Sequence, residues 1–542
     1  MIDVFVIGAG PSGLLMTAEL IRHGLTCRLI DKNSSPSDKS KAIAMQARTL
    51  EVLNYVGVAE ECIAQGLKIT HFIPTSHGKK ICDISFKETK TPYPFVLSLE
   101  QSKLELILIK KLETLGCRIE RGVELLDFQQ NEQDIRLFLK NNSTGNIEVC
   151  QTKWLIGCDG AHSTVRKQLD LEFEGKSFPQ IFSLVDLEVE WKYPRNCFMG
   201  FLEEKDILFA APIQEKNRYR LIFQLERGRD FLKRNKHLKQ GEISSTDLPK
   251  PTLEEVAQIV HQYADANAVV KNPVWLTHFN VSSRMVSRYQ KGRVFLVGDA
   301  AHIHSPVGGQ GMNTGLQDGF NLAWKIAFAH KRKSKASLLE SYHDERYFVG
   351  KNLLKGTEKT TNFILTRSKF LIFLRNAFMS LMTSFSAVRN KFVSTVSEIN
   401  VYYPLSQWIV QTRHPSLKLQ AGRRAPNAAI FYEGLISSLF SLWKTTTSFH
   451  LLLIDLKAQF SNIDDIAKIL ETQNAGFVKV HVVRSNGAND GKYLQDLHKE
   501  IQTLYGDLTI YLIRPDGYVG YCGPLSRLEP LHEYLNNFRT SF

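Results

Sequence analysis

Short apolar runs that end in a glycine or an acid recur along this chain, and helix-like stretches lie between them. Residues 4–7 lead into a glycine-rich turn and a helix-like run over 14–23. A second apolar run over 27–30 ends in an acid, and runs over 155–157 and 293–298 do the same later in the chain. Short buried strands that alternate with helices are typical of a parallel sheet. The pattern therefore predicts a Rossmann-like α/β domain.

The middle of the chain shows a different pattern. Apolar runs cover 198–202 and 207–211, and residues 219–225 alternate between apolar and polar positions. Alternation with a period of two predicts strands that bury one face, as in an antiparallel sheet. We expect this β-rich region, with strands near 70–100 and a helix over 251–264, to be inserted into the α/β domain as a substrate-binding sheet.

The composition is that of a large globular protein. Hydrophobic residues make up 43% of the 542 residues and charged residues 23%. A chain of this length should divide into roughly two to four domains. The eight cysteines include no CxxC pair, and the histidines lack metal-ligand spacing. We therefore expect reduced thiols, no metal site and a cytoplasmic location.

The first turn has the spacing of a dinucleotide-binding loop and contains Gly8, Gly10, Pro11, Ser12 and Gly13. One glycine permits the tight turn, another lets the backbone approach a pyrophosphate, and the third lets the helix pack on the strand. The pyrophosphate would lie against free N–H groups at the helix N-terminus. Asp31, which lies 18 residues after Gly13, suits a carboxylate that accepts hydrogen bonds from a ribose.

Two later segments separate FAD from the nicotinamide dinucleotides, which use the same loop. One apolar run ends at Gly298 and Asp299 and continues into a glycine-rich stretch over 305–313. Another ends at Asp159 and Gly160. Distant segments that converge on one large cofactor indicate FAD, with Asp299 holding its ribityl hydroxyls.

The glycine loop, the Asp-Gly segment and the Gly-Asp segment, which extends through residues 321–325, resemble those of the FAD-dependent aromatic hydroxylases. These are single-component flavoprotein monooxygenases, and the resemblance covers most of the chain. It implies further FAD contacts at Arg48, Gln101 and Arg166. It also implies that Pro306, Gly311, Met312 and Asn313 line the flavin.

The resemblance implies a reaction as well. NADPH or NADH docks transiently and reduces the flavin, O2 adds at the flavin C4a carbon, and the hydroperoxide passes an oxygen to a phenolic or polycyclic aromatic substrate. No position matches a base motif for substrate activation, so the catalytic residues stay unknown. Tyr219, Arg220 and Arg284 are candidates for lining the substrate pocket. We expect His302 and His304 to be structural, with His302 on a buried turn where it satisfies backbone groups.

The end of the chain resembles the thioredoxin-like domain of the phenol and polyketide hydroxylases, through residues 421–428 and 514–519. Cys522 is its one cysteine, so we expect no redox activity but a role in oligomer packing or shielding, with a homodimer as the expected assembly. The expected divisions are an FAD-binding domain over 1–175 and 280–345, a substrate domain over 176–279, a helical segment over 346–415 and a thioredoxin-like domain over 416–542.

The net charge of +13 is concentrated in one window. Residues 351–391 contain eight lysines and arginines against the single acid Glu358, with apolar runs between them. This window is either a helical segment with solvated bases, the interpretation we favour, or a surface that touches an anionic membrane or attracts NADPH. No recognition motif accompanies the charge, so we do not expect nucleic-acid binding.

Two other functions share the same cofactor motifs. One is an FAD reductase or oxidase that inserts no oxygen, and the other is a non-catalytic protein that binds flavin structurally or as a sensor. A serine hydrolase is disfavoured because the chain has no GxSxG elbow.

Overall fold

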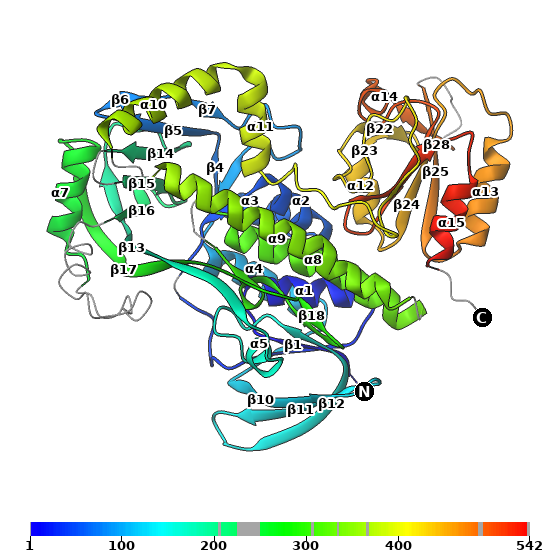
Figure 1. The fold of residues 1–542 in the computed structure, drawn as a ribbon, viewed down its shortest axis with the longest axis horizontal. Helices are drawn as coiled ribbons and strands as arrows, with labels where there is room; N and C mark the ends of the chain where they lie inside the picture. The colour runs from blue at the N-terminus through cyan, green and yellow to red at the C-terminus, as the bar shows by residue number, and fades with distance from the viewer. Residues whose placement is uncertain are drawn as a thin grey trace.

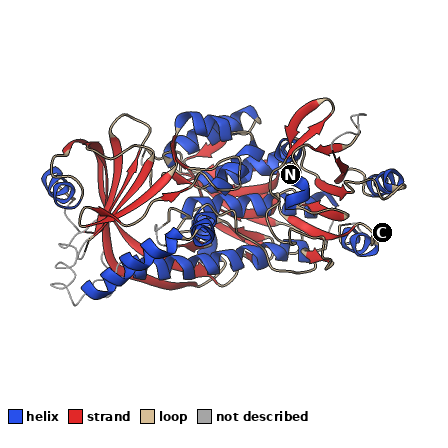
Figure 2. Cartoon of the chain, turned by 90° about the horizontal axis from the view of Figure 1, so that it is seen from above, coloured by secondary structure: helices blue, strands red, loops and turns tan. Residues whose placement is uncertain are grey.

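The computed structural model of the chain describes residues 2–38, 40–203, 207–224, 250–304, 308–332, 335–364, 368–485 and 492–538. Three parts follow one another along the long axis (Figure 1): an insert domain built on a large sheet, a central α/β domain and a C-terminal domain. Figure 2 shows the same order from above, with the strands of the insert domain at the end opposite the C-terminus.

A parallel sheet lies at the centre of the central domain. Its strands run in the order β19–β12–β1–β2–β9, and all neighbours are parallel. The far half of β12 pairs instead with an antiparallel extension, β11 and β10, and β18 pairs with β19. The bounds are β1 (Ile2–Ile7), β2 (Cys27–Asp31), β9 (Ile119–Arg121), β10 (Val123–Gln130), β11 (Ile135–Asn141), β12 (Ile147–Gly157), β18 (Gln290–Lys291) and β19 (Val294–Leu296).

Two buried helices, α1 (Pro11–Arg22) and α8 (Gly311–Arg332), pack closely against each other. Glycines allow this approach, because a Cβ on Gly315 would lie 2.5 Å from the Ser12 hydroxyl and one on Gly319 would lie 3.3 Å from the Met16 Cβ. The first turns of both helices are therefore held side by side. The other helices of this domain are α2 (Ala47–Val56), α3 (Ala59–Gln65), α4 (Gln101–Thr114), α5 (Thr164–Gln168) and the short 3-10 helix η1 (Gly298–Ala300).

The insert domain is a nine-stranded sheet in the order β20–β17–β13–β16–β15–β14–β5–β6, with β7 paired to β5. It is antiparallel as predicted, except that β5 and β14 pair in parallel. Helix α7 (Leu253–Tyr263), which begins with a capping box at Thr252, confirms the helix expected over 251–264. The strands are β5 (His71–Ser76), β6 (Lys79–Lys80), β7 (Ile84–Ser85), β13 (Phe173–Glu190), β14 (Cys197–Leu202), β15 (Ile207–Pro212), β16 (Arg218–Gln224), β17 (Val269–Val286) and β20 (His302–Ile303).

A long two-stranded ribbon joins the insert domain to the central domain. Strands β13 and β17 each span 18 residues and pair along most of their length, and Figure 1 shows them crossing between the two parts. A separate three-stranded sheet is made of β3 (Ala44–Met45), β4 (Leu67–Ile69) and β8 (Val96–Ser98). The insert domain and the central domain are thus joined by continuous strands.

Three helices follow the central domain. They are α9 (Ser337–Ile364), α10 (Lys369–Ser384) and α11 (Ser386–Val396). The helices thus begin and end earlier than the helical segment predicted over 346–415. Helix α9 already begins at Ser337, because its buried side chains pack on α8. Among the described residues no single helix is long and apolar enough to cross a membrane; α10 and α11 would qualify as a pair but are bent by 101°.

The C-terminal domain has a mixed α/β fold, in agreement with the thioredoxin-like domain that the resemblance implied. Strands β25–β24–β27–β28 form its centre, where β24 is parallel to β25 and antiparallel to β27. Cys522 is buried in β28. The elements are β21 (Val410–Gln411), β22 (Ala429–Tyr432), β23 (Leu435–Ser438), α12 (Leu439–Lys444), β24 (Phe449–Ile454), α13 (Ile463–Gln473), β25 (Val478–Ser485), β26 (Leu494–Asp496), α14 (Glu500–Leu504), β27 (Thr509–Ile513), β28 (Val519–Pro524) and α15 (Glu529–Asn536).

Candidate functional site

One large cavity, with a volume of about 1160 Å³, extends from the parallel sheet of the central domain to the insert domain. It is lined by many of the residues predicted to contact a cofactor: Gly8, Gly10, Pro11, Ser12, Asp31, Gln101, Asp159, Gly160, Asp299, Gly311 and Met312. Gly13, Arg48, Arg166, Gly298 and Asn313 do not belong to its lining. Pro306 lies outside the described residues.

The three glycines of the first loop have different surroundings. Gly8 has a φ of +100°, and a Cβ there would lie 2.5 Å from the Cys158 carbonyl oxygen. A Cβ on Gly13 would lie 1.9 Å from the Gly8 oxygen, whereas one on Gly10 would meet nothing within 4 Å. Gly8 and Gly13 are therefore required by the turn and the packing, and Gly10 leaves open space beside the cavity.

The loop also leads into the N-terminus of helix α1, which favours an anion. Gly10 caps α1 without a side-chain hydrogen bond, and Pro11 follows at the first helical position. The first N–H groups of α1 can thus donate hydrogen bonds to a ligand, and the helix dipole favours an anion there. Asp31 is fixed beside the loop, because its two carboxylate oxygens accept hydrogen bonds of 2.8 Å from the backbone N–H groups of Ala9 and Asn33.

Asp299 supports the fit of a large polyhydroxylated cofactor. Its carboxylate lines the cavity from the turn η1, is exposed to that space, and makes no hydrogen bond to another described residue. The turn is anchored from behind, since the Asp318 carboxylate accepts a hydrogen bond of 3.2 Å from the N–H of Gly298. A carboxylate held rigidly but left without a partner can be satisfied by sugar-like hydroxyl groups.

Asp159 is a second carboxylate that can accept further hydrogen bonds. One of its oxygens accepts hydrogen bonds from the N–H groups of Thr164 and Val165, at 2.7 and 3.2 Å, and so caps α5. Its other oxygen is buried and has no hydrogen-bond partner among the residues that the structure describes, and burial raises the pKa of this acid. Arg166, by contrast, donates to the carbonyl oxygens of Ala161 and Ala300, so it ties the Asp-Gly segment to the Gly-Asp turn.

Asn313 shapes the glycine-rich stretch before α8. Its amide donates to the carbonyl oxygens of Ala44 and Gly309, at 2.9 and 2.7 Å, and its oxygen accepts from the N–H of Gln46. The loop that carries Gly308 and Gly309 is thereby fixed against the segment at Ala44. Asn313 acts on the cavity through these neighbours, while Gly311 and Met312 line it directly.

Arg48 takes a different position from the one expected of a cofactor contact. Its guanidinium is buried, donates to Glu51 at 2.9 Å and to the carbonyl oxygen of Asp516 at 2.7 Å, and lies over the ring of Tyr518. Two of these partners belong to the C-terminal domain. The side chain thus points toward the domain boundary and joins the two parts of the chain.

His302 bonds to a side chain instead of the backbone groups predicted for it. Its Nε2 lies 2.7 Å from the Oδ2 oxygen of Asp318, and the Oδ1 oxygen of the same carboxylate accepts a hydrogen bond of 2.6 Å from Arg346. Burial opposes ionisation of Asp318, but Arg346 and His302 lower its pKa. His302 is structural, as expected, and it helps to fix the acid that anchors the Gly298 turn. His304 lines the cavity.

The insert domain supplies an apolar wall. Because successive side chains of a strand point to opposite faces, Arg220 and Ile222 of β16 face the cavity, whereas Tyr219 and Leu221 pack with α7 in the core behind it. Of the three candidates for lining the substrate pocket, Arg220 lines the cavity, whereas Tyr219 and Arg284 do not. The wall carries several aromatic rings, from Phe72, Phe86, Phe182, Phe198 and Phe209.

Arg220 forms an ion pair with Asp186 that carries no net charge. It donates to both carboxylate oxygens of Asp186, at 2.8 and 2.7 Å, and to the carbonyl oxygen of Lys41 at 3.2 Å. Both side chains of the pair are buried. The guanidinium is thus rigid and charge-compensated, which suits it to orient a substrate by hydrogen bonding without adding a net charge to the wall.

Glu398 is a cavity-lining acid that sequence reasoning missed. It lies just after α11 in the left-handed region, with a φ of 59°, and accepts a hydrogen bond from the Gln317 amide. Burial raises its pKa to about 8. No local motif marks this position, because Glu398 reaches the cavity where the turn after α11 meets Gln317 of α8.

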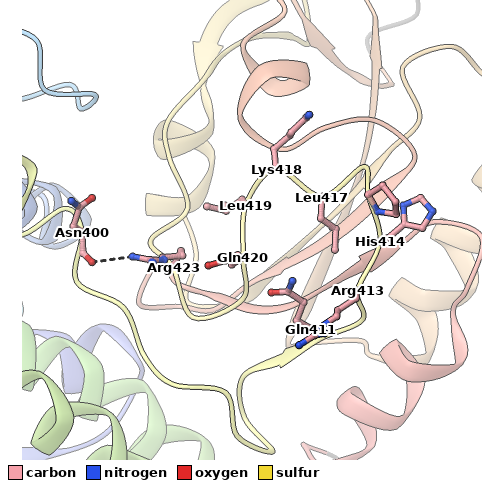
Figure 3. A pocket seen from close by; sticks show the side chains of 10 residues that line it. Asn400, Gln411, Arg413, His414, Leu417, Lys418, Leu419, Gln420 and Arg423 are labelled. Atoms are coloured by element: carbon pink, nitrogen blue, oxygen red, sulfur yellow. Dashed lines mark hydrogen bonds between the residues drawn. The ribbon is translucent and has the colours of Figure 1, made fainter. Parts of the chain in front are cut away.

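A second cavity, of about 700 Å³, lies at the start of the C-terminal domain. Figure 3 shows its lining, in which the Arg423 side chain donates to the carbonyl oxygen of Asn400. Arg413, His414 and Lys418 also line it. None of the residues predicted to contact the cofactor lies here, so the larger cavity is the candidate site.

Comparisons with known proteins agree with this site. The model of the FAD binding domain family matches residues 1–357. The chain is 30% identical over 526 residues to an uncharacterized aromatic compound monooxygenase, YhjG, of Bacillus subtilis, covering 96% of this chain and 94% of that protein. It is 29% identical to pentachlorophenol 4-monooxygenase of Sphingobium chlorophenolicum, covering 98% and 96%.

A solved structure extends the likeness to the whole fold. The anhydrotetracycline hydroxylase OxyS from Streptomyces rimosus superposes with a TM-score of 0.73 and 25% identity, over 99% of this chain and 98% of that one. The match therefore includes the C-terminal domain as well as the cofactor motifs. This chain belongs to the FAD-binding-domain family and, within it, to the FAD-dependent aromatic hydroxylases.

Proposed function

We propose that the protein hydroxylates a phenolic or polycyclic aromatic compound at an activated ring carbon, with NAD(P)H and O2 as co-substrates. The observation that carries the proposal is the continuity of the large cavity. The same space is lined at one end by the dinucleotide loop and Asp299, and at the other by the aromatic wall of the insert domain. An aromatic substrate held on that wall would face the cofactor directly.

Different residues of the chain would bind the cofactor and orient the substrate. FAD, when bound, supplies the reducing equivalents taken from NAD(P)H and the activation of O2. The α1 N-terminus would bind the pyrophosphate, and Asp31 and Asp299 would bind the hydroxyl groups on either side of it. The apolar wall excludes water and orients the ring, which protects the reaction from wasteful loss of the activated oxygen.

The volume of the cavity suits a cofactor and an aromatic substrate together, and its apolar wall suits a flat ring. The cavity of about 1160 Å³ exceeds the usual range for a site that holds one small molecule, roughly 300–1000 Å³. The relatives that resemble the chain include enzymes named for pentachlorophenol and for 6-methylpretetramide. Both names are compatible with a flat aromatic ring on the phenylalanine wall.

The test is oxygen transfer. Purified protein loaded with FAD would be incubated with NADPH, 18O2 and a panel of phenols, naphthols and polycyclic aromatic compounds, and the products analysed by mass spectrometry. The proposal expects one labelled oxygen in the ring of at least one compound. NADPH oxidation that yields only hydrogen peroxide with every compound would indicate an oxidase, and flavin binding without NADPH oxidation would indicate a non-catalytic flavoprotein.

A wall variant makes this test specific to the site. Phe209→Asp places a charge on the apolar wall and should abolish hydroxylation while leaving FAD bound, because Phe209 lies on the insert domain. Val274→Asp is a matched control, since Val274 is 71% exposed on β17 of the same domain. Equal loss of activity in both variants would assign the effect to the fold of the insert domain and not to substrate binding.

A further inference from the structure

Helix α10 presents an apolar surface to solvent. Six of its large apolar side chains are exposed, and they are Phe370, Leu371, Phe373, Leu374, Phe378 and Leu381. Figure 1 shows α10 at the outer edge of the molecule, above the strands β5, β6 and β7, with α11 turning away from its end. Contiguous apolar surface of this kind is rare on proteins that stay free in water and marks an interaction site.

The exposed side chains follow the periodicity of the helix. Phe373 and Leu381 follow Phe370 by 3 and 11 residues, so the three side chains project from one face. The opposite face, with Ile372 and Arg375, is buried, and Arg375 donates to the carbonyl oxygen of Ile364 at 2.9 Å. The helix is thus anchored through one face and leaves the more apolar one outside.

Basic side chains border this surface. The ring of Phe363 on α9 contacts that of Phe378 on α10, with centroids 6.3 Å apart, so the exposed faces of the two helices are continuous. Lys355 and Lys359 precede Phe363 at intervals of four residues, which places them on the same face of α9, and both are exposed. Lys391 is exposed on α11.

The large cavity opens beside the same surface. Thr360 of α9 and Phe392 of α11 line the cavity and are also exposed, so exposed side chains of these two helices form one border of the cavity. Phe392 is 41% exposed and Phe385, between α10 and α11, is 57% exposed. The apolar surface therefore continues to the rim of the opening.

We propose that this surface, the α10–α11 platform, docks on an anionic lipid membrane and places the opening of the cavity at the lipid interface. Apolar side chains flanked by lysines match the acyl chains and the anionic headgroups of such a membrane. The bent pair α10 and α11 would lie in the interface and not cross it. On the proposed function, a lipophilic aromatic substrate would then enter the cavity from the membrane.

Vesicle flotation tests the docking directly. The FAD-loaded protein would be mixed with vesicles of phosphatidylcholine alone and of phosphatidylcholine with phosphatidylglycerol, and we expect it to float with the anionic vesicles. The triple variant Phe370→Ser, Phe373→Ser and Phe378→Ser should weaken this binding by more than about tenfold. The double variant Leu435→Ser and Ile436→Ser is the matched control, because these exposed apolar residues lie on β23.

The lysines are tested separately. Lys355→Gln with Lys359→Gln should lower binding to the anionic vesicles by about tenfold and leave any binding to neutral vesicles unchanged. Binding that is equal in all variants, or absent from both kinds of vesicle, would overturn the proposal. So would a concentration-dependent dimer in sedimentation that the triple variant abolishes while no vesicle binding occurs, because the platform would then be a contact between two copies.

This outcome is distinguishable from a failure of the proposed function. Flotation needs no catalysis, so vesicle binding without hydroxylation of any compound would refute the function and leave the docking intact. If both hold, anionic vesicles should raise the rate with a vesicle-partitioned naphthol and not with a water-soluble phenol. The triple variant should lose that stimulation while it keeps its rate with the water-soluble phenol.

Discussion

Arg514 of the C-terminal domain donates to both carboxylate oxygens of Glu345 on α9, at 2.7 and 2.9 Å. Both side chains are buried, and Lys325 of α8 donates to the same carboxylate at 2.8 Å. Burial alone would raise the pKa of Glu345, but Arg514 and Lys325 lower it to about 2. The segment 321–325, which the resemblance marked as part of a cofactor motif, thus contributes to the boundary between two domains.

The ion pair predicts that the C-terminal domain stabilises the rest of the chain. Arg514→Met should lower the free energy of unfolding by about 3–5 kcal/mol, because it leaves the buried Glu345 and Asp516 carboxylates undercompensated. Urea denaturation followed by fluorescence would measure the change. Lys271→Ala is the control, since its pair with Glu190 is exposed on both sides and should contribute far less to stability than the buried pair. Equal losses in the two variants would contradict this prediction.

The glycine loop allows a sharp distinction between binding and folding. Gly10→Val should abolish FAD binding with little effect on the stability of the FAD-free protein, because a Cβ on Gly10 meets no described atom within 4 Å. Gly13→Ala should instead destabilise the fold, since its Cβ would lie 1.9 Å from the Gly8 oxygen. Flavin absorbance and thermal unfolding of the FAD-free variants measure the two effects. A Gly10→Val protein that keeps full flavin content would show that the pyrophosphate does not bind here.

Asp299→Ala should remove flavin and preserve the fold. The carboxylate faces the cavity and forms no hydrogen bond within the described residues, so its loss costs no internal contact. The loss of hydrogen bonds to a charged group should weaken FAD binding by about 2–3 kcal/mol, or 30- to 150-fold. Flavin titration would show this, with Asp127→Ala, an exposed acid of β10, as the control. Retention of full flavin affinity would remove Asp299 from the site.

The sequence predicted the parts of the site that depend on local backbone. Gly8 and Asp299 end or follow strands, and the spacing of such turns can be seen in consecutive residues. Their place in one cavity follows because the carboxyl ends of parallel strands meet at one edge of the sheet. The order of the insert strands could be predicted as antiparallel, but the face that each residue of β16 presents could not, since Tyr219 and Arg220 are neighbours on opposite faces.

The remaining parts depend on contacts between distant segments. Arg48 follows a strand-like segment of the cofactor domain, yet its guanidinium is fixed by Asp516, which lies 468 residues later. Glu398 likewise accepts a hydrogen bond from Gln317, which lies 81 residues earlier on α8. No periodicity or motif in one sequence encodes such pairs. They could be identified only after the helices had been placed in space.

The buried Glu398 predicts a dependence of stability on pH. Its pKa is raised by burial from 4.5 to about 8, and it is influenced by the neighbouring charges of Arg346, Asp318 and Arg48. A folded-state pKa above the unfolded value means that the folded protein holds the proton more tightly. This contribution to stability is fully present below pH 4.5 and is lost as the pH rises toward 8.

Glu398→Gln tests this directly, because the amide keeps the shape and the hydrogen bond to Gln317 but cannot ionise. The wild-type protein should lose about 4 kcal/mol of stability relative to the variant between pH 5 and pH 8. Urea denaturation at matched flavin content would measure the difference, and Glu190→Gln, an exposed acid, should show no such trend. If the two curves stay parallel from pH 5 to 8, Glu398 is already ionised in the folded protein, and it cannot serve the cavity as a proton-holding group at neutral pH.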